Sequence, residues 1–319
     1  MKKNVLLFSC SFFLLSMTAQ AQFPYAQTFK NTSAPGVVFG GSASSFLTAG
    51  VVGGDVDGTG YLRLTDATTY QKGYVYGNTP FPTTFGLKAS FEYFTYGGDG
   101  ADGICFFLFD ATATPFSIGS FGGSLGYAQF NSPVSAGVSK AYLGIGLDEF
   151  GNFANPTEGR QGGPGFRANS VVLRGKGDGS AATATNYPYL TSRQTSAMTP
   201  AFNISGGTSR APLTSDAGYR RVDLSMKPRT GGGYDISVDI TVGGSTPATY
   251  NVISSYAYTT VAPDNLKFGF AGSTGGSTNY HEIRNLTIDV FDPSPLLTPT
   301  AKDTSVAACY GAPLRFNIL

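Results

Sequence analysis

Residues 100–109 read GADGICFFLF, a polar, glycine-rich string that changes into an unbroken apolar run at Ile104. A strand with one solvated face alternates apolar and polar residues, whereas this run is apolar at every position. We therefore expect residues 103–109 to form a central β-strand that is covered on both faces. The carboxylate of Asp102 would then stand at the start of that strand.

Apolar and aromatic stretches recur along the rest of the chain, separated by clusters of Gly, Pro, Asn and Asp. None of them sustains a helical period of 3.6 residues, and residues 234–240 alternate as a strand with one buried face does. The pattern predicts an all-β fold, a sandwich or a barrel. The other expected strands cover residues 60–64, 85–93, 142–147, 170–173, 219–226, 234–242, 266–271 and 283–291.

The charge of the chain is almost balanced, with 21 Lys and Arg against 20 Asp and Glu, and only 13% of the residues are charged. Nucleic acids and anionic membranes attract proteins through a strong basic field, so this composition disfavours nucleic-acid binding. No stretch reaches the roughly 20 apolar residues that a spanning helix needs, so we expect no transmembrane segment.

The N-terminus combines two lysines, a short apolar run and a small-x-small motif that ends at Ala21. This order is typical of a secretory signal peptide, so we expect residues 1–21 to be removed and the protein to be secreted or held at the cell surface. Residues 22–293 would form one β domain. After a proline-rich boundary the sequence becomes strand-like again, so residues 294–319 are interpreted as a linker and the incomplete start of an Ig-like or cadherin-like domain. The alternative is a short tail packed on the main domain.

Three segments resemble the L-type (legume-lectin-like) lectin family in their order along the chain. Residues 100–108 are similar to its ADGxAFFL strand, residues 142–152 (YLGIGLDEFGN) to its VAVExDTxxN metal loop, and residues 268–275 (FGFAGSTG) to its VGFSASTG strand and loop. The likeness is greatest to the bacterial branch, in which a DEFGNFxNP run is followed by a GGPG loop. The resemblance implies a two-sheet antiparallel jelly-roll sandwich, concanavalin A-like, in a lectin or adhesin that binds glycans without catalysis.

The resemblance also implies where the sugar binds. Asp102 would follow a cis peptide bond and accept charge-assisted hydrogen bonds from sugar hydroxyls. A backbone N–H of the glycine loop and the Asn152 amide would donate, and the Phe150 ring would pack on the apolar side of the sugar. From the residues alone, Asp102 could equally be a turn residue. The remaining residues expected at the sugar are Gly122, Gly123, Gly275, Gly276, Ser277 and Asn279.

Calcium prefers a cage of oxygen ligands, and the resemblance implies that the Asp148 carboxylate, the Phe150 carbonyl and the Asn152 side chain supply three of them. Thr157 stands where the family has a second carboxylate. Asn155 and Glu158 are the nearby substitutes for it.

Other residues of this region depart from the family. The glutamate that binds the family's transition metal is replaced by Gly146, so we expect calcium but no transition metal. Glu149 is interpreted as an extra ligand or a solvated charge, and His281 as closing the loop that begins at Gly275.

Two other functions stay open. Glycosidases on a similar sandwich use an alternating E-x-D-x-E strand, whereas here Asp148 and Glu149 are adjacent and would point to opposite faces. The His281-Glu282 pair lacks the second histidine of a zincin, because Asn285 holds that position. We therefore assign no catalytic residue. The loss of metal ligands also fits a structural or adhesive module without a sugar site.

Overall fold

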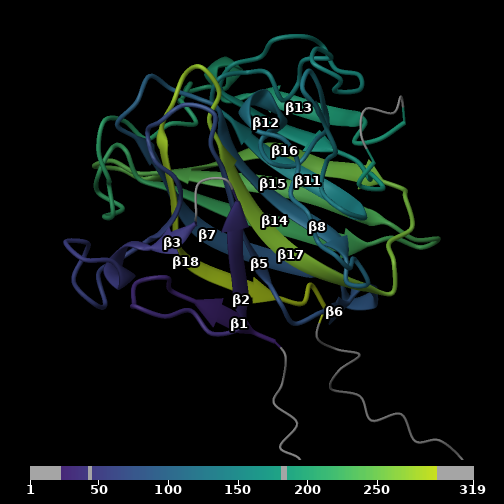
Figure 1. The fold of residues 1–319 in the computed structure, drawn as a ribbon, viewed down its shortest axis with the longest axis horizontal. Coiled ribbons are helices and arrows are strands. Elements are labelled where there is room, and N and C mark those ends of the chain that lie inside the picture. Colours follow the sequence, from purple (N-terminus) through teal and green to yellow (C-terminus); the bar gives the residue numbers. More distant parts are fainter. Residues whose placement is uncertain (1–22, 42–44, 181–184, 293–319) are drawn as a thin grey trace, which may run out of the picture.

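The chain forms a two-sheet antiparallel β-sandwich, seen here in a computed structural model that describes residues 23–41, 45–180 and 185–292 (Figure 1). The predicted all-β jelly-roll class is confirmed, and the described residues contain only short 3-10 helices besides strands and turns. Within these ranges no helix is long and apolar enough to cross a membrane. Residues 1–21 and 294–319 lie outside the described residues, so the signal peptide and the further domain stay predictions.

Sheet A has the strand order β16-β15-β14-β7-β18-β4-β3, with β1 paired to β18. Its strands are β1 (Tyr25–Gln27), β3 (Phe46–Leu47), β4 (Leu62–Thr65), β7 (Leu87–Tyr96), β14 (Arg220–Pro228), β15 (Tyr234–Val242), β16 (Ala248–Tyr258) and β18 (Tyr280–Asp289).

Sheet B has the order β13-β12-β11-β8-β17-β5-β2, with β6 paired to β17. Its strands are β2 (Val37–Gly41), β5 (Lys72–Gly77), β6 (Phe81–Pro82), β8 (Gly103–Asp110), β11 (Ala141–Asp148), β12 (Ser170–Arg174), β13 (Tyr189–Gln194) and β17 (Asn265–Ser273). The loops carry the hairpin β9 (Phe130–Asn131) and β10 (Val134–Ser135) and the 3-10 turns η1 (Thr48–Gly50), η2 (Thr83–Phe85), η3 (Gly122–Ser124) and η4 (Thr195–Ala197).

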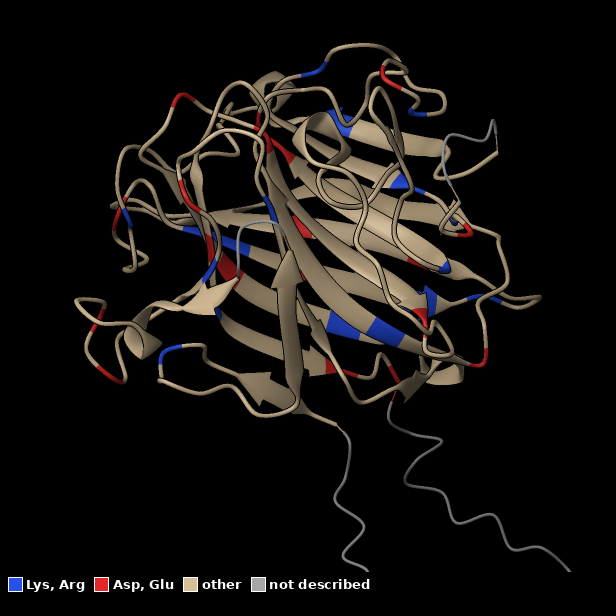
Figure 2. Ribbon diagram, in the orientation of Figure 1, with Lys and Arg blue, Asp and Glu red and all other residues tan. Residues whose placement is uncertain are grey.

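The expected strands are all present, and β15 alternates buried and half-buried residues as its sequence predicted. The strands β2, β5, β13 and β16 were not among them. The case of β16 has a clear physical reason. Its pairing with β15 is interrupted by register shifts on either side of Val238, and most of its residues are exposed or half-buried. A bulged edge strand of this kind loses the strict alternation by which a strand is recognised. Basic and acidic residues are interspersed over both sheets and the loops (Figure 2), as the balanced composition indicated.

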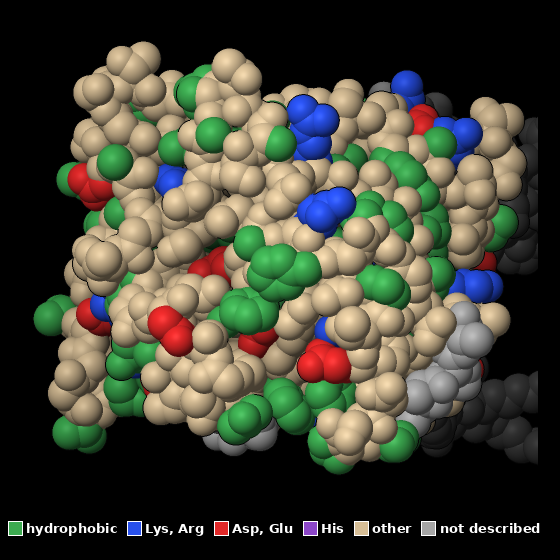
Figure 3. Space-filling model, turned by 90° about the horizontal axis from the view of Figure 1, so that it is seen from above, with side chains coloured by type: hydrophobic (Ala, Val, Ile, Leu, Met, Phe, Trp, Pro, Cys, Tyr) green, Lys and Arg blue, Asp and Glu red, His purple; other side chains and the backbone are tan. Residues whose placement is uncertain are grey.

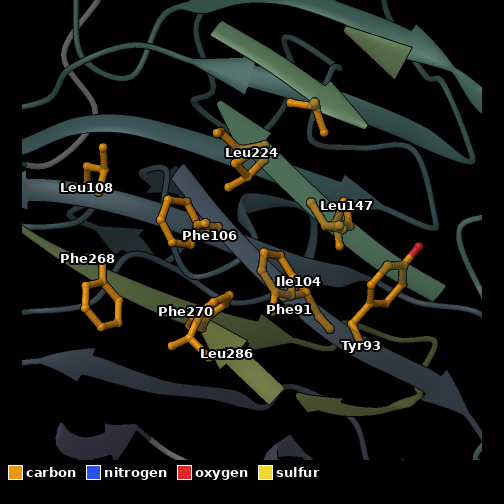
Figure 4. Close-up of a cluster of buried hydrophobic side chains, with 14 of the residues drawn as sticks. Phe91, Tyr93, Ile104, Phe106, Leu108, Leu147, Leu224, Phe268, Phe270 and Leu286 are labelled. Carbon is orange, nitrogen blue, oxygen red and sulfur yellow. The ribbon is translucent and has the colours of Figure 1, made fainter. Parts of the chain in front are cut away.

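β8 lies between β11 and β17 in the middle of sheet B, and all of its residues except the last are buried. The inner face of β8 packs against sheet A. There the ring of Phe106 lies 5.2 Å from the ring of Phe270, which meets Phe91 of β7 edge-on at 4.8 Å (Figure 4). The central strand predicted from the apolar run is therefore confirmed.

The outer face of β8 is covered by loops rather than by a second sheet. Cys105, Phe107 and Phe109 form a second buried cluster with Tyr127 and Phe153, which lie in the loops before and after β11. Covering this face therefore fixes the two loops against the sheet. These loops also carry Gly122, Gly123, Phe150 and Asn152, which the sequence predicted at the sugar, so the outer cluster positions the candidate site.

Phe107→Ala should lower the free energy of unfolding by about 3–5 kcal/mol, because it leaves a cavity under the loops. Urea denaturation followed by circular dichroism measures this change. Val261 is 69% exposed, so Val261→Ala is the matched control and should change stability by less than about 0.5 kcal/mol. Equal effects of the two substitutions would show that the outer face of β8 is not covered.

Candidate functional site

A depression of about 520 Å³ lies at the end of the sandwich where the loops before β8, after β11 and after β17 meet. The loop between β17 and β18 is the yellow crest at the top left of Figure 1. Figure 3 looks down from that side and shows acidic side chains close to a group of hydrophobic ones. The lining residues are Tyr70, Ala101, Asp102, Phe121, Gly122, Gly123, Phe130, Ser132, Pro133, Phe150, Asn152, Glu158, Gly275, Gly276 and Ser277.

Asp102 is held in the wall of this depression by its backbone. The Ala101–Asp102 peptide bond is cis, as the resemblance implied. The Asp102 N–H donates to the Ser273 carbonyl at 2.9 Å, and its carbonyl accepts from Glu149 N–H at 3.0 Å. The last residue of β17 and the loop after β11 thus both fix the backbone of Asp102.

The carboxyl group of Asp102 is buried, and its Oδ2 atom has no hydrogen-bond partner in the structure. Burial, followed by the nearby charge of Asp148, raises the pKa of Asp102 to about 8, although the positive charge of Arg160 opposes the rise. Buried polar atoms are nearly always partnered. An unpartnered carboxyl oxygen that lines a depression is therefore a ready acceptor for a ligand hydroxyl.

Glycines bring the walls of the depression close to Asp102. A Cβ at residue 275 would lie 2.9 Å from Asp102 Oδ2, and a Cβ at residue 123 would lie 2.2 Å from the Cβ of Asn152. Gly122 has a φ of +60°, which favours glycine. At Gly276, by contrast, a Cβ would meet nothing within 4 Å.

The glycine turn offers one backbone donor to a ligand. The Gly122 N–H already donates to the Thr274 carbonyl at 3.2 Å. Of the two predicted donors, Gly123 is therefore the candidate, and it lies directly against Asn152.

Aromatic rings line two sides of the depression. Phe150 meets Phe166 edge-on at 5.5 Å, and Tyr70 meets Phe121 edge-on at 5.6 Å. Phe121 in turn lies 5.4 Å from Phe130. Of these rings, the sequence analysis assigned only Phe150 to the site. Tyr70 could have been found as an aromatic residue in a polar turn, and in the structure it is 63% exposed.

Asn279 is not among the residues that line the depression, and its contact with the sugar stays a prediction. The Asn279 side chain is buried. Its Nδ2 donates to Glu149 Oε2 at 2.7 Å, and its Oδ1 accepts from Gly98 N–H at 2.8 Å. His281 is also buried, with Nε2 3.1 Å from Glu149 Oε1 and Nδ1 2.6 Å from Thr65 Oγ1. Glu149 is therefore neither a metal ligand nor a solvated charge but the centre of a buried polar network.

The predicted calcium ligands do not fit a calcium ion in this arrangement. Asp148 accepts from Gly151 N–H on Oδ1 and from Phe153 N–H on Oδ2, each at 2.8 Å. Asn155 gives its carbonyl, and Glu158 its carboxylate, to the guanidinium of Arg160. In the described part of the chain no three His, Cys, Asp or Glu side chains gather at one point. The assignment of Asn155 and Glu158 to calcium stays a prediction. Arg160 binds the Asn155 backbone carbonyl and one of the two Glu158 carboxylate oxygens.

The position of the family's transition-metal glutamate is filled differently. A Cβ at Gly146 would lie only 2.4 Å from Cδ1 of the Phe153 ring, which packs on the strand at this point. The glycine thus admits an aromatic ring of the outer cluster where a glutamate would not fit.

The chain matches no known protein-family profile and no curated protein sequence. Its structure is similar to the Lotus tetragonolobus seed lectin (16% identity, 83% of this chain and 97% of that chain, TM-score 0.52). It is also similar to the lectin of Bauhinia forficata in complex with GalNAc (14% identity, 84% and 100%, TM-score 0.50). A third similar structure is the exoplasmic/lumenal domain of VIP36 in its Ca²⁺/Man2-bound form (14% identity, 81% and 82%, TM-score 0.50). The chain therefore has the fold of the legume lectins and of VIP36.

Asp102 should make the protein less stable as the pH rises. Its pKa is about 3.8 in an unfolded chain and about 8 in the folded protein, so the unfolded state loses the proton first. The contribution of this group to the free energy of unfolding therefore falls between these two values. Asp102→Asn cannot ionise, so its melting temperature relative to wild type should rise over this range, by about 2–4 °C for each kcal/mol.

Thermal unfolding at a series of pH values tests this expectation, with Asp99→Asn as the control. The Thr278 N–H donates to the exposed Asp99 carboxylate and lowers its pKa. The control should therefore show no such rise. A constant difference between Asp102→Asn and wild type would contradict the raised pKa of Asp102.

Proposed function

We propose that this protein is a non-catalytic carbohydrate-binding protein, an exported bacterial lectin or adhesin module whose sugar site is the depression around Asp102. One observation carries the proposal. The Asp102 carboxyl is buried, lacks a partner on Oδ2, and lines a depression whose other walls are glycines and aromatic rings.

These groups match the chemistry of a pyranose. Vicinal hydroxyls can donate to the ionised Asp102 carboxylate, and such charge-assisted bonds are stronger than neutral ones. A bound sugar would therefore favour the ionised form and lower the raised pKa of Asp102. Asn152 and the Gly123 N–H supply donors on the facing wall, and Phe150 or Tyr70 offers a flat apolar surface to the C–H face of the ring. Because glycine has no side chain, these positions leave room for the edge of a sugar ring to reach Asp102.

The fold comparisons support the same class of ligand, since the similar Bauhinia forficata lectin holds GalNAc and the similar VIP36 domain holds Man2. Export rests on the sequence of residues 1–21 alone. The calcium assistance implied by the resemblance is not included, because Arg160 binds the Asn155 carbonyl and the Glu158 carboxylate.

A glycoside hydrolase is the alternative that one observation favours, since Glu158 is a second carboxylate in the lining of the depression. Hydrolysis needs two carboxyl groups that flank the scissile bond, one of them free to act as nucleophile or base. Glu158 is instead paired with Arg160 at 2.6 Å. We therefore expect bound oligosaccharides to be recovered intact. Release of new reducing ends would favour the enzyme.

Asp102→Ala should weaken glycan binding by about 10–100-fold, because removing a charged hydrogen-bonding group costs about 1.5–3 kcal/mol. A glycan array, followed by titration calorimetry with mannose, galactose and N-acetylgalactosamine, measures the loss. Asp289→Ala is the control, since Asp289 is exposed at the other end of β18. If wild type binds no glycan, the protein is a structural module without a sugar site. If Asp102→Ala folds and binds as wild type does, the site lies elsewhere.

Gly275→Ala should also abolish binding while the protein stays folded. The added methyl group would stand 2.9 Å from Asp102 Oδ2, where the sugar hydroxyl should lie. Gly50→Ala is the matched control, because Gly50 does not line the depression and a Cβ there would come no closer than 3.4 Å to its neighbours. Binding measured by the same titrations should be retained in the control. Equal binding by both variants would show that the sugar does not approach Asp102 along this wall.

A further inference from the structure

Arg160 carries a positive charge inside the loop region behind the depression. Its side chain is 0% exposed, and a buried guanidinium is stable only when its donors are bonded. Its four acceptors are Asn155 O (3.2 Å), Ser124 Oγ (3.2 Å), Thr157 Oγ1 (3.1 Å) and Glu158 Oε2 (2.6 Å).

These acceptors are oxygens, a carbonyl and a carboxylate among them, of the kind that a hard cation gathers. We propose that the Arg160 guanidinium is a built-in cation that organises the site in place of a calcium ion, so that sugar binding is independent of calcium. This inference rests on the proposed function. In this role Arg160 is a positioning residue, because it acts on the ligand through other side chains.

Arg160 reaches the sugar-facing amide in two steps. It holds the Asn155 backbone carbonyl at 3.2 Å, and the Asn155 Nδ2 donates to Asn152 Oδ1 at 3.2 Å. With its oxygen engaged in this way, Asn152 keeps its Nδ2 donors for the ligand. A calcium ion bound to the Asn152 oxygen would orient the amide in the same sense.

Arg160 also ties the loop after β11 to the glycine turn. Its Nη1 donates to Ser124 Oγ, and that hydroxyl donates to the Gln129 carbonyl at 2.9 Å. Ser124 follows Gly123, the candidate backbone donor, in the turn η3. One guanidinium thus sets the relative position of two donors that face the same ligand.

A second buried arginine supports the same loop from its other side. Arg174 Nε donates to the Phe153 carbonyl at 2.7 Å, and its Nη1 donates to the carbonyls of Gln161 and Tyr187, each at 2.8 Å. Carbonyl oxygens of this loop are therefore held at several points by the protein's own cations.

A calcium ion could not share this arrangement. It needs oxygens at about 2.3–2.6 Å, whereas the Asn155 backbone carbonyl and Glu158 Oε2 are bonded to Arg160, and both Asp148 oxygens accept backbone N–H groups. The guanidinium charge would also repel a divalent cation. The same guanidinium charge favours the ionised form of two nearby carboxyl groups, because Arg160 opposes the rise that burial causes in the pKa of Asp102 and of Asp148.

The first experiment uses the wild-type full chain and no sugar. Its melting temperature is measured in millimolar calcium chloride and in excess chelator, and calcium binding is titrated by calorimetry. A ligand that binds the native state raises its stability, so we expect no shift and no calcium binding. A clear rise of the melting temperature in calcium would overturn the proposal, whatever the protein does with sugars.

The second experiment compares Arg160→Met, Arg160→Lys and the control Arg221→Met, whose arginine is exposed and pairs with Asp223 on β14. For the sugar of the panel that wild type binds, Arg160→Met should lose about 10–100-fold in affinity, as loss of a supporting shell does. Arg160→Lys should recover part of the loss, because it keeps the charge but not the fork of donors. Wild-type affinity should be the same in calcium and in chelator.

A spectroscopic readout keeps the inference testable if Arg160→Met is less stable or if no sugar of the panel binds. In isotope-labelled protein without sugar, the side-chain amide signals of Asn152 and Asn155 should shift in Arg160→Met and not in Arg221→Met. Unchanged amide signals, or full sugar binding by a folded Arg160→Met, would overturn the role of Arg160. Absence of sugar binding in wild type would overturn the proposed function instead.

Discussion

The apolar run of β8 must be covered on both of its faces, and most of the structure follows from this requirement. At about 25 cal/mol for each Å² of apolar surface removed from water, burial of a strand's large side chains is a dominant favourable contribution to folding. The inner face, with Ile104 and Phe106, requires sheet A. The outer face, with Phe107 and Phe109, requires the loops that carry Tyr127 and Phe153. The candidate site lies at the end of the sandwich where these loops meet the loop after β17.

The carboxyl groups of Asp102, Asp148 and Glu149 are all buried at the end of the sandwich that carries the candidate site. Each has a different environment. Asp148 is satisfied by backbone N–H groups, and Glu149 by Asn279 and His281. Asp102 alone among them keeps an oxygen without a partner. Because burying an unpaired polar atom is costly, this difference distinguishes Asp102, the candidate ligand-binding group, from two carboxyl groups that hold the loops together.

The protein shares the fold of known lectins, whereas the chemistry of its loop after β11 departs from what the family resemblance implied. Identities of 14–16% over most of each chain support the sandwich, but function depends on the site that is built on a fold. Here Gly146 admits the Phe153 ring, and Arg160 binds the Asn155 backbone carbonyl and Glu158 Oε2. The loop after β11 is thus held by aromatic packing and by guanidinium groups.

The sequence by itself determined the all-β class and the central strand, because both follow from the period of apolar residues within one segment. The resemblance of three separate segments to the lectin family supplied the jelly-roll sandwich and the neighbourhood of Asp102. It also placed Gly122, Phe150, Asn152 and Gly275 in loops that the structure brings together. Only the tertiary structure decided what Arg160, Asn279 and Tyr70 do. Their partners are Ser124, Glu149 and Phe121, which lie in other segments of the chain. A side chain's partner across such a separation depends on how the loops pack, and no local pattern of residues encodes that packing.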